Sequence, residues 1–171
     1  MTNPEAGGTA DAEKDILHAS LNRHRDAVLW KLNGLDDEQL RRPLTPTGTS
    51  LLGLVKHLAS VEYGWFVQTF GREPEPLWFD PYEGEDMSVT VDETTEQIIA
   101  FYGRARAAAD RTISELPLDA SGRPAWRENT VSLRWTLVHM LTETARHAGH
   151  MDIVRELIDG ATGDPPPTVA G

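Results

Sequence analysis

One stretch in the C-terminal third of the chain concentrates side chains that bind metal ions. His139, Glu143, His147 and His150 follow one another at spacings of four, four and three residues. On an α-helix these spacings place all four side chains, together with Arg146, on one face with an arc of about 100°. Imidazoles and carboxylates are ligands of zinc and of similar divalent ions. The pattern fits a metal site and also fits the alternative, an ordinary solvated helix face.

A second segment supplies a further imidazole. His57 shares a helical face with apolar residues between Leu54 and Trp65, so its ring is predicted to point into the protein. A buried imidazole needs a polar partner, either a hydrogen-bonding group or a metal ion. Together with Glu143 and His147 it makes a set of two histidines and one carboxylate. Three protein ligands leave one position open for water, a thiolate or a substrate oxygen, as in catalytic zinc sites.

Neighbouring groups compete for roles around His57, Glu143 and His147. His150 and His139 are alternative ligands or outer hydrogen-bonding groups, and their spacing fits both roles. Arg146 and Asp152 are predicted either to orient the imidazoles or to form an ordinary surface ion pair. His150 and Arg146 are the candidates for a direct catalytic role. Zinc is the first choice of metal, and nickel, iron or manganese suit the same donors.

Four long amphipathic helices are predicted to position these groups. Their expected ranges, with the capping or terminating residues, are 11–32 ended by Gly34, Thr49 to Phe70 ended by Gly71, 93–116 after Asp92, and 131–159 ended by Gly160. A short turn is expected over 36–42, and strands near Trp126 and Leu133 are a further option. Four apolar stripes bury one another in a bundle, so we predict an all-α four-helix bundle with long connecting loops.

The chain is predicted to form one domain over residues 11–160. Residues 1–10 are small and polar and residues 161–171 are rich in proline, so both are expected to be flexible tails. The 171 residues, of which 39% are hydrophobic, suit a single globular core. The segment 72–92 carries three prolines and three aromatic residues and is predicted to be an ordered cover. The five tryptophans are expected either to wall an apolar cleft or to pack in the core.

Composition excludes several classes of protein. The formal net charge of −11 disfavours nucleic acid and anionic lipid as partners. No apolar run of membrane-spanning length and no signal-like start is found, so we expect a cytoplasmic protein. The absence of cysteine excludes disulfides, thiolate ligands and an internal thiol nucleophile. Any thiol chemistry must therefore use an external thiol.

Longer stretches of the sequence resemble the DinB-like superfamily. The resemblance is carried by the runs Leu54–Phe66 and Glu143–Glu156 and by the pair Arg134–Trp135, and residues 30–35 and 48–54 also fit. It extends from Asp15 to Gly160 and looks like the signature of an actinobacterial DinB-like family of unknown function. The resemblance implies a metal-binding four-helix bundle, commonly a homodimer.

The superfamily resemblance also implies a class of reaction. It includes bacillithiol and mycothiol S-transferases and the mycothiol-dependent maleylpyruvate isomerase. Many members use three histidines, whereas Glu143 here resembles the His, Glu, His set of the isomerase branch, and His150 stands where many relatives have glutamine. We therefore expect a metal-dependent transferase or isomerase with mycothiol as cosubstrate and a small electrophile as substrate. The alternatives are a metal-dependent hydrolase of a small substrate and a non-catalytic, stress-related binding or dimerisation protein.

Overall fold

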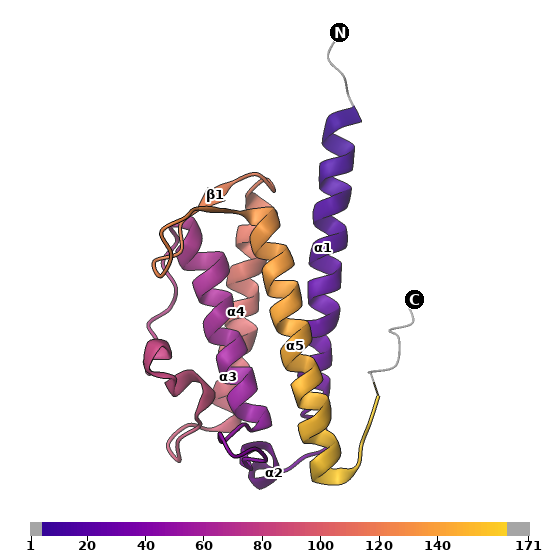
Figure 1. The fold of residues 1–171 in the computed structure, drawn as a ribbon, viewed down its shortest axis with the longest axis vertical. Coiled ribbons are helices and arrows are strands. Elements are labelled where there is room, and N and C mark those ends of the chain that lie inside the picture. The colour runs from indigo at the N-terminus through magenta and orange to yellow at the C-terminus, as the bar shows by residue number, and fades with distance from the viewer. Residues whose placement is uncertain (1–4, 164–171) are drawn as a thin grey trace.

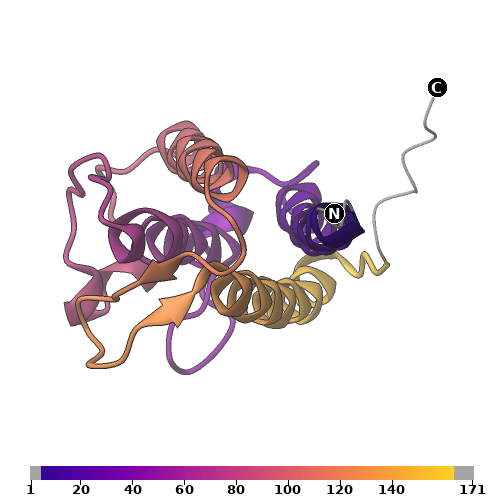
Figure 2. The same cartoon turned by 90° about the horizontal axis from the view of Figure 1, so that it is seen from above.

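The computed structural model describes residues 5–163, so residues 1–4 and 164–171 of the two predicted tails lie outside the described residues. Four long helices lie side by side along the long axis of the molecule (Figure 1). They are α1 (Glu5–Trp30), α3 (Leu51–Glu62), α4 (Thr95–Glu115) and α5 (Leu133–Asp159). Helix α3 contacts both α4 and α5, and α1 packs against α5 (Figure 2). The all-α four-helix bundle predicted from the sequence is confirmed.

Hydroxyl caps set the starts of three of these helices. Ser50, Thr94 and Ser132 precede α3, α4 and α5, and each side-chain oxygen accepts the N–H group of the residue three positions further on. The predicted caps Thr49 and Asp92 are therefore wrong by one and two residues, because the next hydroxyl along the chain takes the capping position. Helix α1 begins at Glu5, which is earlier than the predicted residue 11.

The expected second helix, from Thr49 to Phe70, is divided into three kinds of helix. Helix α3 ends at Glu62, a π-helical turn follows over Tyr63–Val67, and a 3₁₀ turn covers Gln68–Phe70. Gly71 then ends the segment with φ of 69°, the left-handed conformation that favours glycine. A π-helical turn widens the helix locally and is frequent at functional sites.

The connecting segments contain short elements of their own. Helix α2 (Asp37–Arg41) begins with a capping box formed by Asp36 and Gln39. Single 3₁₀ turns lie at Pro81–Glu83 (η3) and Glu85–Met87 (η4). Strands β1 (Ser121–Gly122) and β2 (Val131–Ser132) pair antiparallel beside the start of α5. A strand therefore lies next to Leu133 as suggested from the sequence, whereas Trp126 lies in the loop between the strands.

A buried ion cluster joins three helices inside the apolar core, and we call it the arginine cluster. The guanidinium of Arg25 on α1 donates through Nε and Nη2 to the Glu62 carboxylate on α3, at 2.7 and 2.5 Å. Its Nη1 donates to Asp110 on α4 at 2.7 Å. Burial alone would lower the pKa of Arg25, but the two carboxylates raise it above its usual range. The positive charge of Arg25 is thus paired with the carboxylates of Glu62 and Asp110.

Candidate metal centre

Helices α3 and α5 bring together the three residues that the sequence singled out. The Oε1 atom of Glu143 lies 3.0 Å from Nε2 of His147 and 3.7 Å from Nε2 of His57. One ligand atom from each of the three residues lies within 4.8 Å of the other two. The side chains are between 12% and 19% exposed, so they are shielded from bulk water without being sealed from it. We call these three residues the acceptor cluster.

His57 and His147 both direct Nε2 toward Glu143 and Nδ1 away from it. Nδ1 of His57 contacts Oδ2 of Asp86 at 2.7 Å, and Nδ1 of His147 lies 3.4 Å from Nδ1 of His150. A neutral imidazole has one N–H donor and one lone pair. If Nδ1 of His57 donates to Asp86, its Nε2 lone pair faces Glu143. The contact with Asp86 therefore favours the His57 tautomer that a metal ligand needs, whereas Nε2 of His147 donates to the Glu143 carboxylate and must release that proton to bind a metal ion.

Asp86 is the residue of this centre that the sequence analysis missed. It lies in η4, and the ammonium of Lys56 on α3 fixes that turn by donating to the carbonyl groups of Glu85 and Ser88 at 2.9 and 2.8 Å. Lys56 is itself buried and pairs with Glu93 at 2.7 Å. These contacts seat the turn on α3, one residue away from His57 along the helix.

Gly53 makes the close seating of this turn sterically feasible. A Cβ atom at position 53 would collide with the backbone carbonyl oxygen of Met87, which directly follows Asp86. Glycine is favoured where two backbone segments approach one another closely. Gly53 therefore affects the centre indirectly: it lets η4 pack close against α3, where Asp86 contacts His57.

The electrostatics of the acceptor cluster keep Glu143 ionised. Burial would raise the pKa of its carboxyl, but His147, Arg146 and His57 together lower it below its usual value. Burial and the proximity of His57 lower the pKa of His147. The lowered pKa values of Glu143 and His147 favour an ionised carboxylate and a neutral imidazole, which are the forms that bind a divalent cation.

The other predicted candidates lie around the cluster rather than in it. His150 is exposed and touches His147, while the guanidinium of Arg146 lies 3.6 Å from Oε2 of Glu143. His139 stacks on Trp135 with the two ring planes 8° apart, and burial lowers its pKa. Asp152 pairs with Lys31 on α1 instead of contacting an imidazole. His150 and Arg146 therefore remain close to the chemistry, and His139 and Asp152 are engaged elsewhere.

The donor set of the acceptor cluster fits a divalent metal ion. Two ligands of a tetrahedral zinc ion are about 3.4 Å apart, as follows from Zn–N and Zn–O bonds of about 2.1 Å. The observed separations of 3.0 and 3.7 Å lie on both sides of that value. All three ligand atoms lie within 4.8 Å of one another. Two histidines and one carboxylate are a donor set for zinc, nickel, iron or manganese.

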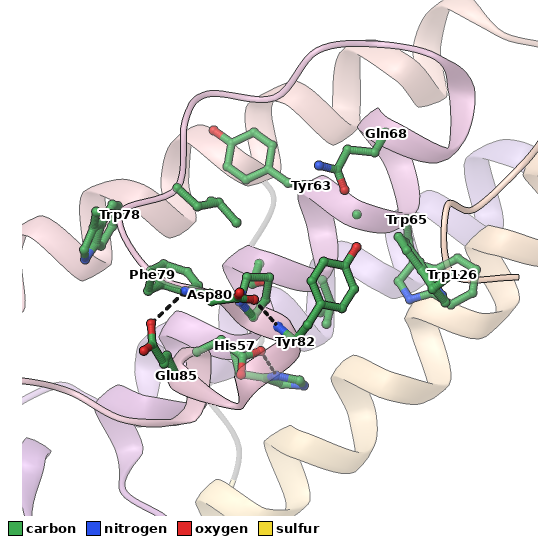
Figure 3. Close-up of a pocket in the computed structure, with 16 residues that line it drawn as sticks. His57, Tyr63, Trp65, Gln68, Trp78, Phe79, Asp80, Tyr82, Glu85 and Trp126 are labelled. Atoms are coloured by element: carbon green, nitrogen blue, oxygen red, sulfur yellow. Dashed lines mark hydrogen bonds and ion pairs between the residues drawn. The ribbon is translucent and has the colours of Figure 1, made fainter.

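A cavity of about 900 Å³ opens beside His57 (Figure 3). The π-helical turn supplies Trp65 and Gly64 to its wall, the segment after α3 supplies Trp78, Phe79 and Tyr82, and the β1–β2 loop supplies Trp126. Trp126 packs edge-on against Trp65, with ring centroids 5.1 Å apart. The segment predicted as an ordered cover thus lines this cavity, and three of the five tryptophans lie in its wall.

Fold and site together define a helical bundle with a candidate metal centre between two helices and an aromatic cavity next to it. The Mycothiol-S-transferase family model matches residues 16–160, and the chain belongs to this family. The match confirms the DinB-like resemblance and supports thiol S-transferase activity at the level of the family. Comparison with curated proteins gives no match. Among residues 5–163, none of the helices combines the length and apolar character needed to cross a membrane.

Proposed function

We propose that the protein is a metal-dependent mycothiol S-transferase that binds one divalent ion through His57, Glu143 and His147. Membership of the Mycothiol-S-transferase family supports the reaction class. The observation that carries the metal site is the convergence of two imidazole nitrogens on one carboxylate oxygen, at 3.0 and 3.7 Å. Zinc is the first choice of metal, and nickel, iron and manganese are chemically suitable.

Each residue of the centre has a role in this proposal. The three ligands hold the ion, Asp86 orients His57, and His150 orients His147. When bound, the ion lowers the pKa of a coordinated thiol and keeps the sulfur nucleophilic at neutral pH. The chain has no cysteine, so the thiol comes from the cosubstrate. Arg146, close to Glu143, contributes positive charge at the edge of the centre.

The proposed reaction joins the thiol to an electrophilic carbon. The sulfur–carbon bond forms, the bond from that carbon to its leaving group breaks, and the leaving group departs with the electron pair. The thiol proton goes to solvent. The cavity beside His57 holds the electrophile within reach of the centre. The chain thus binds both reactants and brings them together.

Metal content is the first test of the proposal. Elemental analysis of protein prepared without an affinity tag should give one equivalent of metal for the wild type and none for His57→Ala. His24→Ala is the matched control, since it removes an imidazole from α1, outside the acceptor cluster. Equal metal content in the wild type and in His57→Ala would show that His57 is not a metal ligand.

Thiol transfer is the second test. Metal-loaded wild type should accelerate the alkylation of mycothiol by monobromobimane, and both the stripped protein and His57→Ala should lose this acceleration. Metal-dependent cleavage of a nitrophenyl ester without thiol would instead favour the hydrolase. Absence of both metal and activity would favour the non-catalytic alternative. Isomerisation, the homodimer, the cytoplasmic location and the division into tails and bundle remain predictions from the sequence.

A further inference from the structure

We infer that the cavity beside the centre accepts an aromatic electrophile that is neutral or positively charged, and that it discriminates against anions. The inference rests on the proposed function, because it names the substrate class of that same site. It follows from the walls of the cavity, from the charges around it and from its position next to His57.

Aromatic rings form opposite walls of the cavity. Trp65 and Trp126 lie on one side, Phe79 and Trp78 lie on the other, and Tyr82 stands over His57 (Figure 3). Tyr82 is 70% exposed, so its ring has free surface that a ligand can cover. Flat aromatic ligands gain both apolar burial and ring contacts in such a space. The shape and chemistry of the walls therefore favour an aromatic substrate.

The charges lining the cavity are negative. Asp80, Glu85 and Asp86 contribute carboxylates, whereas no lysine or arginine is found among the lining residues of the described chain. The Asp86 carboxylate is occupied by its contact with Nδ1 of His57. The Asp80 carboxylate accepts the backbone N–H of Tyr82, and the Glu85 carboxylate accepts that of Asp80, at 2.8 Å each. These hydrogen bonds hold two solvent-exposed carboxylates at the cavity, and neither forms an ion pair within residues 5–163.

Basic groups near the walls are engaged in other contacts. The ammonium of Lys56 lies 4.3 Å from the ring centroid of Phe79 but forms an ion pair with Glu93. The guanidinium of Arg127 lies over the rings of Trp65 and Trp135 and does not line the cavity. An anionic substrate would therefore lose water contacts without gaining a cationic partner from the wall.

The position of the cavity connects these properties to the reaction. His57 belongs both to the cavity wall and to the acceptor cluster, so a bound ring lies next to the centre where the thiol is held. A dicarboxylate such as maleylpyruvate would bring two negative charges into a cavity whose charged lining residues Asp80, Glu85 and Asp86 are acidic. The cavity thus favours transfer to an uncharged or cationic aromatic substrate over isomerisation of a dicarboxylic acid.

Matched benzylic chlorides test the inference in turnover. The neutral 4-methylbenzyl chloride, the anionic 4-(chloromethyl)benzoate and a cationic chloride bearing a trimethylammonium group are compared with mycothiol and metal-loaded protein. In each reaction sulfur bonds to the benzylic carbon, chloride leaves with the electron pair and the thiol proton goes to solvent. After correction for the uncatalysed rates, we expect kcat/KM for the anion to be lower by about tenfold or more.

Removing the charges of Asp80 and Glu85 should reduce the difference in kcat/KM between the neutral and the anionic substrate. In the double variant Asp80→Asn/Glu85→Gln the amide oxygens still accept the two backbone N–H groups, while the negative charges are gone. The ratio of neutral to anionic kcat/KM should fall several-fold. The double variant Asp119→Asn/Glu156→Gln removes the same charge from exposed positions outside the cavity and should leave the ratio unchanged.

Binding of unreactive analogues tests the inference even if no thiol transfer is observed. Tryptophan fluorescence, to which three wall residues contribute, should report tighter binding of 4-methylbenzyl alcohol and of its trimethylammonium counterpart than of 4-methylbenzoate. Equal or tighter binding of the anion, or no binding of any of the three, would overturn the inference. Loss of transfer with this order of affinities intact would overturn only the proposed function.

Discussion

Glu62 and Glu143 are both glutamates on adjacent helices, but the first is paired with an arginine and the second with two histidines. In the arginine cluster, Glu62 receives two hydrogen bonds from the Arg25 guanidinium. In the acceptor cluster, Glu143 faces Nε2 of both His57 and His147. Arginine brings five N–H donors, whereas a neutral imidazole has only one. For His57 the outward nitrogen already contacts Asp86.

This difference separates a structural cluster from a binding cluster. Where donors and acceptors match, as around Arg25, the group is complete and holds helices together. Where two imidazole nitrogens and a carboxylate oxygen converge on one point, a cation can take the place of the proton between His147 and Glu143 and complete the set. The comparison leads to opposite expectations: loss of a partner in the arginine cluster should cost stability, and loss of a partner around the acceptor cluster should cost affinity for metal.

The largest effect is expected from Arg25→Met, which leaves Glu62 buried without its partner. Breaking a buried ion pair by removing one side costs about 3 to 5 kcal/mol of unfolding free energy. Urea denaturation of the metal-free protein measures this cost. Arg134→Met is the control, since its ion pair with Glu13 is exposed and should contribute little to stability. A cost below that of the control would mean that the arginine cluster is not structural.

A smaller effect is expected from Asp86→Asn, which weakens the outward contact of His57. Loss of such an outer partner lowers metal affinity by about 10- to 100-fold. Competition with a chromogenic chelator measures the affinity, and urea denaturation of the metal-free variant should show little change. Asp92→Asn, at an exposed position in the same connecting segment, is the control. Unchanged affinity in Asp86→Asn would show that the contact does not orient His57.

The smallest effect is expected from the pH dependence of the arginine cluster. Burial would raise the pKa of Asp110, but its contacts with His18 and Arg25 lower it below the ordinary value of 3.8. The folded pKa is depressed, so the stabilisation is present above 3.8 and is lost as the pH falls through the folded pKa. Because Asp110 is 40% exposed, this contribution should be about 1 kcal/mol or less.

Asp110→Asn checks this small contribution. The unfolding free energy of the wild type should fall more steeply than that of Asp110→Asn between about pH 5 and pH 3. Asp15→Asn, at an exposed position on α1, should follow the wild type. Identical slopes for wild type and Asp110→Asn would contradict the lowered pKa. Together the three variants rank the two clusters by stability and by affinity for metal.

The sequence predicted the bundle and the meeting of His57 with Glu143 and His147, because both depend on helical periodicity. Spacings of four residues place groups on one face, and apolar neighbours turn His57 inward. The structure places these three side chains together as expected, while their role as ligands stays a proposal. Periodicity is a property of a single helix, so it could be read directly from the residues.

Asp86 and the π-helical turn could not be predicted in this way. Asp86 lies 29 residues from His57 in a short 3₁₀ turn, and its position depends on the contacts of Lys56 and on the space left by Gly53. These are tertiary contacts without a local repeat. A signal was nevertheless present, since a glycine and a lysine interrupt the apolar residues of α3 and mark where another segment approaches.

The π-helical turn at Tyr63–Val67 has a consequence for how this protein can change in evolution. A turn closed by i→i+5 bonds holds about one residue more than an α-helical turn. Deletion of one residue there would let an ordinary α-helix form, and the residues on either side would keep nearly the same facing, because the π turn already absorbs one extra residue. Such a deletion would change the residues that the turn presents to the cavity, Trp65 among them, without disturbing the register of the helix around it, so substrate preference can change in this way.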